Sequence, residues 1–151
     1  MMENTKCIEK VEKKVCDHFS ISVPNKPEYV NVVRLTTSAI ASRMGFNIEQ
    51  IEDIKVAIAE ACTNAIKHGL CNHNQNFDIN FFIDDEKIII DVIDKGTGFA
   101  SNEIEKPDLT SPKEGGLGIF IIQSLMDKVE IVSEIGKGTR LQMIKYLGDD
   151  I

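Results

Sequence analysis

The sequence predicts an α+β two-layer sandwich, in which a mixed, mostly antiparallel β-sheet packs on α-helices. Two pairs of apolar segments, residues 77–83 with 87–93 and residues 129–134 with 139–146, are each joined by a short polar or glycine-rich turn. Such pairs are typical of β-hairpins. Helical segments are gathered between the strands instead of following each one, as a wound parallel sheet would require.

The first part of the chain is predicted to contain a strand and a helix. Residues 1–18 form a charged lead-in, which we separate from a single domain at residues 19–151. Residues 19–23 alternate between apolar and polar side chains, as a strand does, and prolines close the segment. From residue 28 to Met44 apolar residues recur at helical spacing, and Gly45 follows where such a helix would stop.

A second helix is predicted over residues 48–68. Asn47 is a suitable N-cap, and acidic residues fill the first turns, where the helix dipole favours negative charge. Gly69 follows the last helical residue. The remaining predicted elements are, in order, strands at 77–83 and 87–93, a loop at 95–116, a helix at 117–126, and strands at 129–134 and 139–146.

Composition and charge limit the function classes. The chain has 151 residues, 42% hydrophobic and 27% charged, which suits one globular domain. Its net charge of -7 and pI near 5.0 disfavour direct binding to DNA or RNA. Its apolar runs are too short to cross a bilayer, and no secretory signal is visible. The four cysteines form no CxxC pair, which predicts reduced thiols in a cytoplasmic protein without a cysteine-based metal site.

The segment from Glu60 to Gly69 carries the first chemical signal. On a helix, Glu60, Asn64 and Lys67 share one face, with His68 beside them. This face is next to the apolar stripe that is directed toward the core. Small residues at Ala57 and Ala61 would let a ligand approach. A carboxylate can accept a proton and an amide oxygen can hold Mg²⁺; taken alone, however, the pattern also fits a solvated helix face.

Three glycine-containing segments follow. The strand that ends at Asp94 is followed by Gly96 and Gly98, which permit a tight turn close to a flat ligand, and the Asp can accept a hydrogen bond from an exocyclic amine. By itself this segment also fits an ordinary strand-ending turn, and the last of the three fits a plain β-turn. The other two segments are Gly115-Gly116-Leu117-Gly118, which opens a helix as a phosphate site would, and Gly136-Lys137-Gly138-Thr139 in a hairpin turn. A P-loop and a Rossmann fingerprint are both excluded by spacing.

In this order, the four segments resemble the N, G1, G2 and G3 boxes of the GHKL ATPases, which have the Bergerat fold. The resemblance implies that ATP binds with Mg²⁺ at Asn64, that Asp94 contacts the adenine amine, and that Thr139 supports the adenine end. It also implies that residues 99–115 form an ATP lid. Further candidate nucleotide-binding residues are Lys67, His68, Gly96, Gly98, Lys113, Gly115, Gly116, Leu117 and Gly118. Lys113 is either a phosphate contact or a solvated lysine, and His68 is expected to support the site, not to accept a phosphoryl group.

Within this superfamily, the chain is most similar to anti-sigma factor serine/threonine kinases of the anti-sigma-B type. The likeness extends from Arg34-Leu-Thr-Thr-Ser to Leu125-Met-Asp127. It implies a homodimeric protein that sequesters an alternative sigma factor and phosphorylates an anti-anti-sigma (STAS) antagonist. Glu60 would be the general base and Arg34 the partner-binding residue. Two alternatives are a nucleotide-dependent binding module without kinase activity and the ATPase fragment of a sensor histidine kinase.

Overall fold

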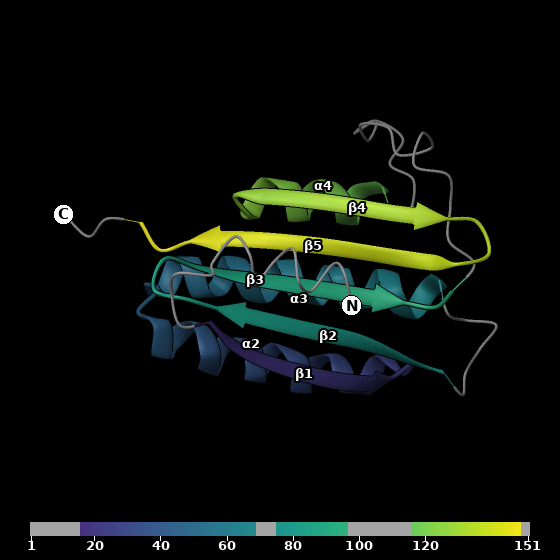
Figure 1. Cartoon of the computed structure of the whole chain (residues 1–151), viewed down its shortest axis with the longest axis horizontal. Coiled ribbons are helices and arrows are strands. Elements are labelled where there is room, and N and C mark those ends of the chain that lie inside the picture. Colours follow the sequence, from purple (N-terminus) through teal and green to yellow (C-terminus); the bar gives the residue numbers. More distant parts are fainter. Residues whose placement is uncertain (1–15, 69–74, 97–115, 149–151) are drawn as a thin grey trace.

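The structure, a computed structural model, describes residues 16–68, 75–96 and 116–148. Its five strands are β1 (Asp17–Pro24), β2 (Asn76–Ile83), β3 (Lys87–Asp94), β4 (Lys128–Glu134) and β5 (Gly138–Tyr146), and the helical segments are η1 (Pro27–Tyr29), α2 (Val30–Met44), α3 (Ile48–His68) and α4 (Gly116–Leu125). The strands form one sheet in the order β1-β2-β3-β5-β4. Helices α2, α3 and α4 lie together behind this sheet in Figure 1.

The two-layer α+β class is therefore confirmed, with one correction. All four pairings between the described strands are antiparallel, so this part of the sheet is not mixed. The reason is that β2 and β3, and likewise β4 and β5, are hairpin neighbours, while β5 returns beside β3 in the opposite direction.

Two element starts differ from the sequence prediction by two residues, and several other element ends differ by one residue. Strand β1 begins at Asp17, inside the segment predicted as the lead-in, because Asp17 and His18 pair with Ile83 and Phe82 of β2. Helix α2 begins at Val30, not at residue 28, because a 3-10 turn with Pro27 at its start precedes it. Neither pairing partners nor the 3-10 turn can be read from local periodicity.

The core lies between the helices and one face of the sheet. Helix α3 buries an apolar stripe that includes Ile54, Ile58 and Ala61, and the facing strands contribute Phe77 and Phe81. Burying a side chain such as isoleucine or phenylalanine stabilises the fold by about 1.5–3 kcal/mol. The core thus fixes α3 across the middle of the sheet.

Both ends of the α2–α3 connection are capped as predicted. Gly45 has φ 98° and its N–H donates to carbonyls of the last turn of α2. The Asn47 side chain accepts from the Gln50 N–H at 2.8 Å, and the Gln50 side chain accepts from the Asn47 N–H at 3.0 Å. This reciprocal capping box satisfies donors that a helix start leaves unpaired. No helix in the described part of the chain is long and apolar enough to span a membrane.

Candidate functional site

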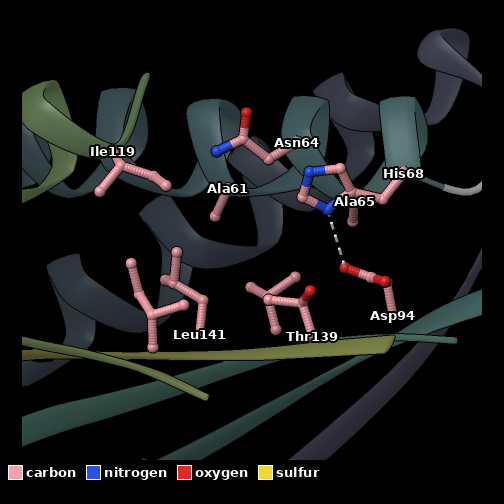
Figure 2. A pocket seen from close by; sticks show the side chains of 10 residues that line it. Ala61, Asn64, Ala65, His68, Asp94, Ile119, Thr139 and Leu141 are labelled. Atoms are coloured by element: carbon pink, nitrogen blue, oxygen red, sulfur yellow. Dashed lines mark ion pairs between the residues drawn. The ribbon is translucent and has the colours of Figure 1, made fainter. Parts of the chain in front are cut away.

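A pocket lies between helix α3 and the sheet, next to the ends of β3 and β5. Figure 2 shows α3 above it and the sheet below. Its polar lining is small and its remaining wall is apolar. The described residues that line it are Ala61, Asn64, Ala65, His68, Val92, Asp94, Ile119, Ile131, Thr139 and Leu141. A mostly apolar cavity with a few convergent polar groups is the usual form of a small-molecule site.

Asp94, the last residue of β3, supplies a buried carboxylate that is 6% exposed. Its Oδ1 accepts a hydrogen bond from the Gly96 N–H at 3.0 Å. Its Oδ2 lies 3.5 Å from His68 Nδ1, and Figure 2 shows the imidazole ring directed toward the carboxylate. The backbone and the histidine therefore fix the orientation of this acceptor at the pocket wall.

Gly96 is required by the close approach of two backbones. A Cβ at this position would lie 2.5 Å from the carbonyl oxygen of His68, the last residue of α3. A side chain here would push the end of α3 away from the end of β3. Gly96 therefore permits the close approach of α3 and β3, its role in shaping a base pocket stays a prediction, and Gly98 lies outside the described residues.

Thr139 is paired with Asp94 across β3 and β5, so both side chains lie on the same face of the sheet. Both residues line the pocket, and Thr139 is 8% exposed. Its hydroxyl lies 2.7 Å from the Ser133 hydroxyl on β4. A Cβ at the adjacent Gly138 would overlap the backbone of Asp94. The hairpin turn and the end of β3 therefore form one packed unit.

The start of α4 meets the polar side of α3. A Cβ at Gly118 would lie 3.0 Å from Glu60 Oε2 and 3.4 Å from Asn64 Oδ1. Asn64 is only 7% exposed and borders the pocket, whereas Glu60 is half-buried. The free N–H groups at the start of a helix favour anions. The start of α4, an amide oxygen and a carboxylate therefore lie side by side.

The oxygen atoms near Asn64 suit a Mg²⁺ ion that is held mainly by the phosphates of a bound substrate. No group of three or more His, Cys, Asp or Glu residues in the described part of the chain could hold a metal ion. Mg²⁺ usually keeps several waters and takes one or two protein oxygens together with substrate phosphates. The Asn64 amide oxygen, beside the start of α4, fits that requirement.

Some predicted site residues are not brought to the pocket. Lys67 is half-buried on α3 but is not among the described residues that line the pocket, because it lies a quarter-turn from His68. Leu117 is 37% exposed, and a Cβ at Gly116 would meet nothing within 4 Å. The remaining predicted residues, Gly98, Lys113 and Gly115, and the lid at 99–115, lie outside the described residues.

Several pocket residues were not identified from the sequence as binding residues. Ala65, not Ala57, accompanies Ala61 in the pocket wall, and Ala57 is fully buried. The strand residues Val92, Ile131 and Leu141 are also part of the wall. Alternation within each strand places these residues on the helix-covered face, but it does not separate a pocket wall from the core.

The fold and the pocket define a nucleotide-binding domain of the histidine kinase-like class. The model of the family described as the histidine kinase-like ATPase domain matches residues 23–145. In solved structures, the chain superimposes on the RsbU and RsbW domains of a Mycobacterium tuberculosis protein with a TM-score of 0.65 at 18% identity, covering 85% of this chain and 32% of that one. A histidine kinase domain from Erythrobacter litoralis gives a TM-score of 0.51 at 17% identity, covering 81% and 60%. These two similarities concern the fold alone.

Sequence relatives narrow the class. A serine-protein kinase RsbW of Oceanobacillus iheyensis is 41% identical over 89% of both chains, and that of Bacillus subtilis is 35% identical over 91% of both. The RsbW of Listeria monocytogenes is 37% identical over 88% of this chain and 89% of its own. The protein therefore belongs to the histidine kinase-like ATPase domain family, among the serine-protein kinases named RsbW. The predicted superfamily and family type are confirmed.

Proposed function

We propose that this protein is an ATP-dependent serine/threonine protein kinase that also acts as an anti-sigma factor. It would sequester an alternative sigma factor and phosphorylate a STAS-type anti-anti-sigma protein. The observation that carries the proposal is the convergence of Asn64, Asp94, Gly118 and Thr139 along one side of α3, in a chain 35–41% identical to serine-protein kinases.

ATP would lie along α3, with its base at the ends of β3 and β5. Asp94 and Thr139 supply polar contacts for adenine, and Gly96 keeps the base pocket open. Gly116 and Gly118 would offer backbone N–H groups to the phosphates at the start of α4. Asn64 would hold Mg²⁺, which neutralises phosphate charge during phosphoryl transfer.

Glu60 is the proposed general base. It lies one helical turn before Asn64 and beside the start of α4, at the phosphate end of the site. The substrate hydroxyl oxygen would attack the γ-phosphorus as the bond from phosphorus to the β–γ bridging oxygen breaks. The hydroxyl proton would pass to the Glu60 carboxylate. General-base catalysis of this kind contributes about 10²- to 10⁴-fold to rate.

The test is transfer of labelled phosphate from ATP to a STAS antagonist. Glu60→Gln should bind Mg²⁺-ATP normally but transfer phosphate about 10²- to 10⁴-fold more slowly. Glu52→Gln is the matched control, because Glu52 is an exposed acid on the same helix that pairs only with Lys55 among the described residues. Full transfer by Glu60→Gln would assign the base elsewhere, and ATP binding without transfer by the wild type would favour a binding module.

Helix α2 is the proposed partner surface. Arg34 is half-buried, and its Nε has no hydrogen-bond partner among the described residues. Its neighbours Val32 and Leu35 are 54% and 61% exposed. Arginine is enriched in protein interfaces, and the buried centres of these interfaces are apolar. The proposal further includes a homodimeric assembly and a cytoplasmic location. It includes no direct contact with nucleic acid, since the net charge of the chain is -7.

A further inference from the structure

A hydroxyl group lies directly behind the pocket. Ser133 on β4 is the register partner of Thr139 on β5, and both are buried, at 7% and 8% exposure. Ser133 Oγ lies 2.7 Å from Thr139 Oγ1 and 3.3 Å from the carbonyl oxygen of Gly138. Thr139 lines the pocket, and Ser133 is not among the described residues that do. Ser133 therefore acts on the pocket through Thr139.

Two of the contacts of Ser133 bear on the direction of the hydrogen bond that it shares with Thr139. A hydroxyl has one proton to donate and two lone pairs that accept. The carbonyl oxygen of Gly138 can only accept, so Ser133 is the donor in that contact. Ser133 then offers a lone pair to Thr139, and both contacts are satisfied together only when Thr139 donates to Ser133. The Thr139 hydroxyl is thereby left as an acceptor toward the pocket.

A second acceptor lies beside it. Asp94 is the register partner of Thr139, and paired residues have Cβ atoms about 4.5–5.5 Å apart. An ionised carboxylate only accepts hydrogen bonds, and its Oδ1 already accepts one from Gly96. The surrounding wall includes the apolar Val92 and Leu141. One small polar group of a ligand would therefore meet two acceptors at this end of the pocket.

We infer that Ser133 is a positioning residue that makes this pocket select a 6-aminopurine over a 6-oxopurine nucleotide. The inference rests on the proposed function, in which an adenine nucleotide binds here. The exocyclic amine of adenine has two N–H donors and satisfies both acceptors. The carbonyl oxygen of hypoxanthine at the same position is itself an acceptor. It would face Thr139 without a donor, and leaving a buried polar group unsatisfied lowers affinity roughly 5- to 100-fold.

The test compares ATP and ITP, which differ only in the base, by titration calorimetry with Mg²⁺. Wild-type protein should prefer ATP by roughly tenfold or more. Ser133→Ala frees the Thr139 hydroxyl to donate to the 6-oxo group, so the ATP-over-ITP preference should fall by roughly tenfold while ATP still binds. Ser133→Thr retains the hydroxyl and should retain the preference.

Two further variants separate specificity from stability. In a Thr139→Val background, Ser133→Ala should cause no further change in the ATP-over-ITP ratio, because the hydroxyl that it controls is gone. Ser124→Ala removes a hydroxyl from the exposed face of α4, where Ser124 donates to the Phe120 carbonyl, and should leave the ratio unchanged.

Three results would overturn the inference. Equal wild-type affinity for ATP and ITP would do so without any variant. An unchanged preference in Ser133→Ala would do so, and so would equal weakening of both nucleotides, since it would give Ser133 only a structural role. In each case the proposed function would survive as long as the wild type binds ATP. A wild type that binds neither nucleotide would instead refute the proposed function itself.

Discussion

Replacing Gly138 with alanine tests whether the β4–β5 turn holds the base end of the pocket in place. Gly138 has φ +98°, and a Cβ there would overlap the carbonyl oxygen of Asp94 and lie 3.0 Å from Lys95 Cα. The left-handed conformation costs a non-glycine residue about 1–2 kcal/mol. Relieving an overlap with packed backbone costs about 1–3 kcal/mol more.

We therefore expect Gly138→Ala to lower the free energy of unfolding by about 2–5 kcal/mol, a large share of the total stability of a small domain. The backbone shift that relieves the overlap moves Asp94 relative to Thr139, which are paired across β3 and β5. Affinity for Mg²⁺-ATP should therefore fall as well. Urea denaturation followed by circular dichroism and calorimetric titration measure the two effects.

Gly45 provides a matched control. It also has φ +98°, but a Cβ there would meet nothing within 4 Å, and it ends α2 instead of packing against Asp94. Gly45→Ala should cost only the conformational term, about 1–2 kcal/mol, and should leave ATP affinity unchanged. Equal stability losses in the two variants, or intact ATP affinity in Gly138→Ala, would refute the argument that the turn is packed against Asp94.

The remaining predictions concern the metal, the partner surface and a buried thiol. Asn64→Ala should abolish Mg²⁺-ATP binding in calorimetry without unfolding the protein; retained affinity would remove Asn64 from the metal role. Arg34→Ala should weaken capture of the sigma factor in pull-down assays and leave ATP affinity intact, and loss of both would place Arg34 in the fold instead. Burial raises the pKa of Cys62 from 9.0 to about 12. The protonated thiol favours the folded state, so its contribution to stability is complete at pH values below the pKa of the unfolded state. This contribution is lost as pH rises toward the pKa of the folded state, so wild type should lose stability relative to Cys62→Ala between pH 9.0 and about pH 12. Iodoacetamide should modify Cys62 only after denaturation, and rapid labelling of the folded protein would contradict this burial.

The sequence predicted most of the elements because their signals are local. Asn47 and Gln50 form the cap expected at the start of α3, and Gly45 ends α2 in the left-handed conformation. The hairpin turns were also placed correctly, because glycine and acidic residues mark them. Periodicity and turn chemistry act over a few residues, and a single sequence carries that information directly.

The contacts within the site depend instead on strand register. The pairing of Asp94 with Thr139, and of Thr139 with Ser133, follows from which strands are neighbours and how they align. A one-residue shift would turn each side chain to the other face. Ser133 was not identified from the sequence for this reason, since it acquires its role only by lying behind Thr139. The requirement for a small residue at Gly118 likewise follows from the close approach of α4 to Glu60.

Helix α3 determines the orientation in which ATP would lie in the proposed kinase site. Glu60, Asn64 and His68 follow one another at intervals of four residues, which at 1.5 Å per residue places them about 6 Å apart along one side of the helix. His68 contacts Asp94 at the end where the base is proposed to bind, while Glu60 lies beside Gly118 at the start of α4. An adenine held by Asp94 would therefore leave its phosphates pointing toward Asn64 and Glu60. The reverse orientation would place anionic phosphates against the buried Asp94 carboxylate, which Coulomb repulsion disfavours. In the proposed site, α3 would thus separate the group that recognises the base from the group that accepts the proton, as phosphoryl transfer from the far end of ATP requires.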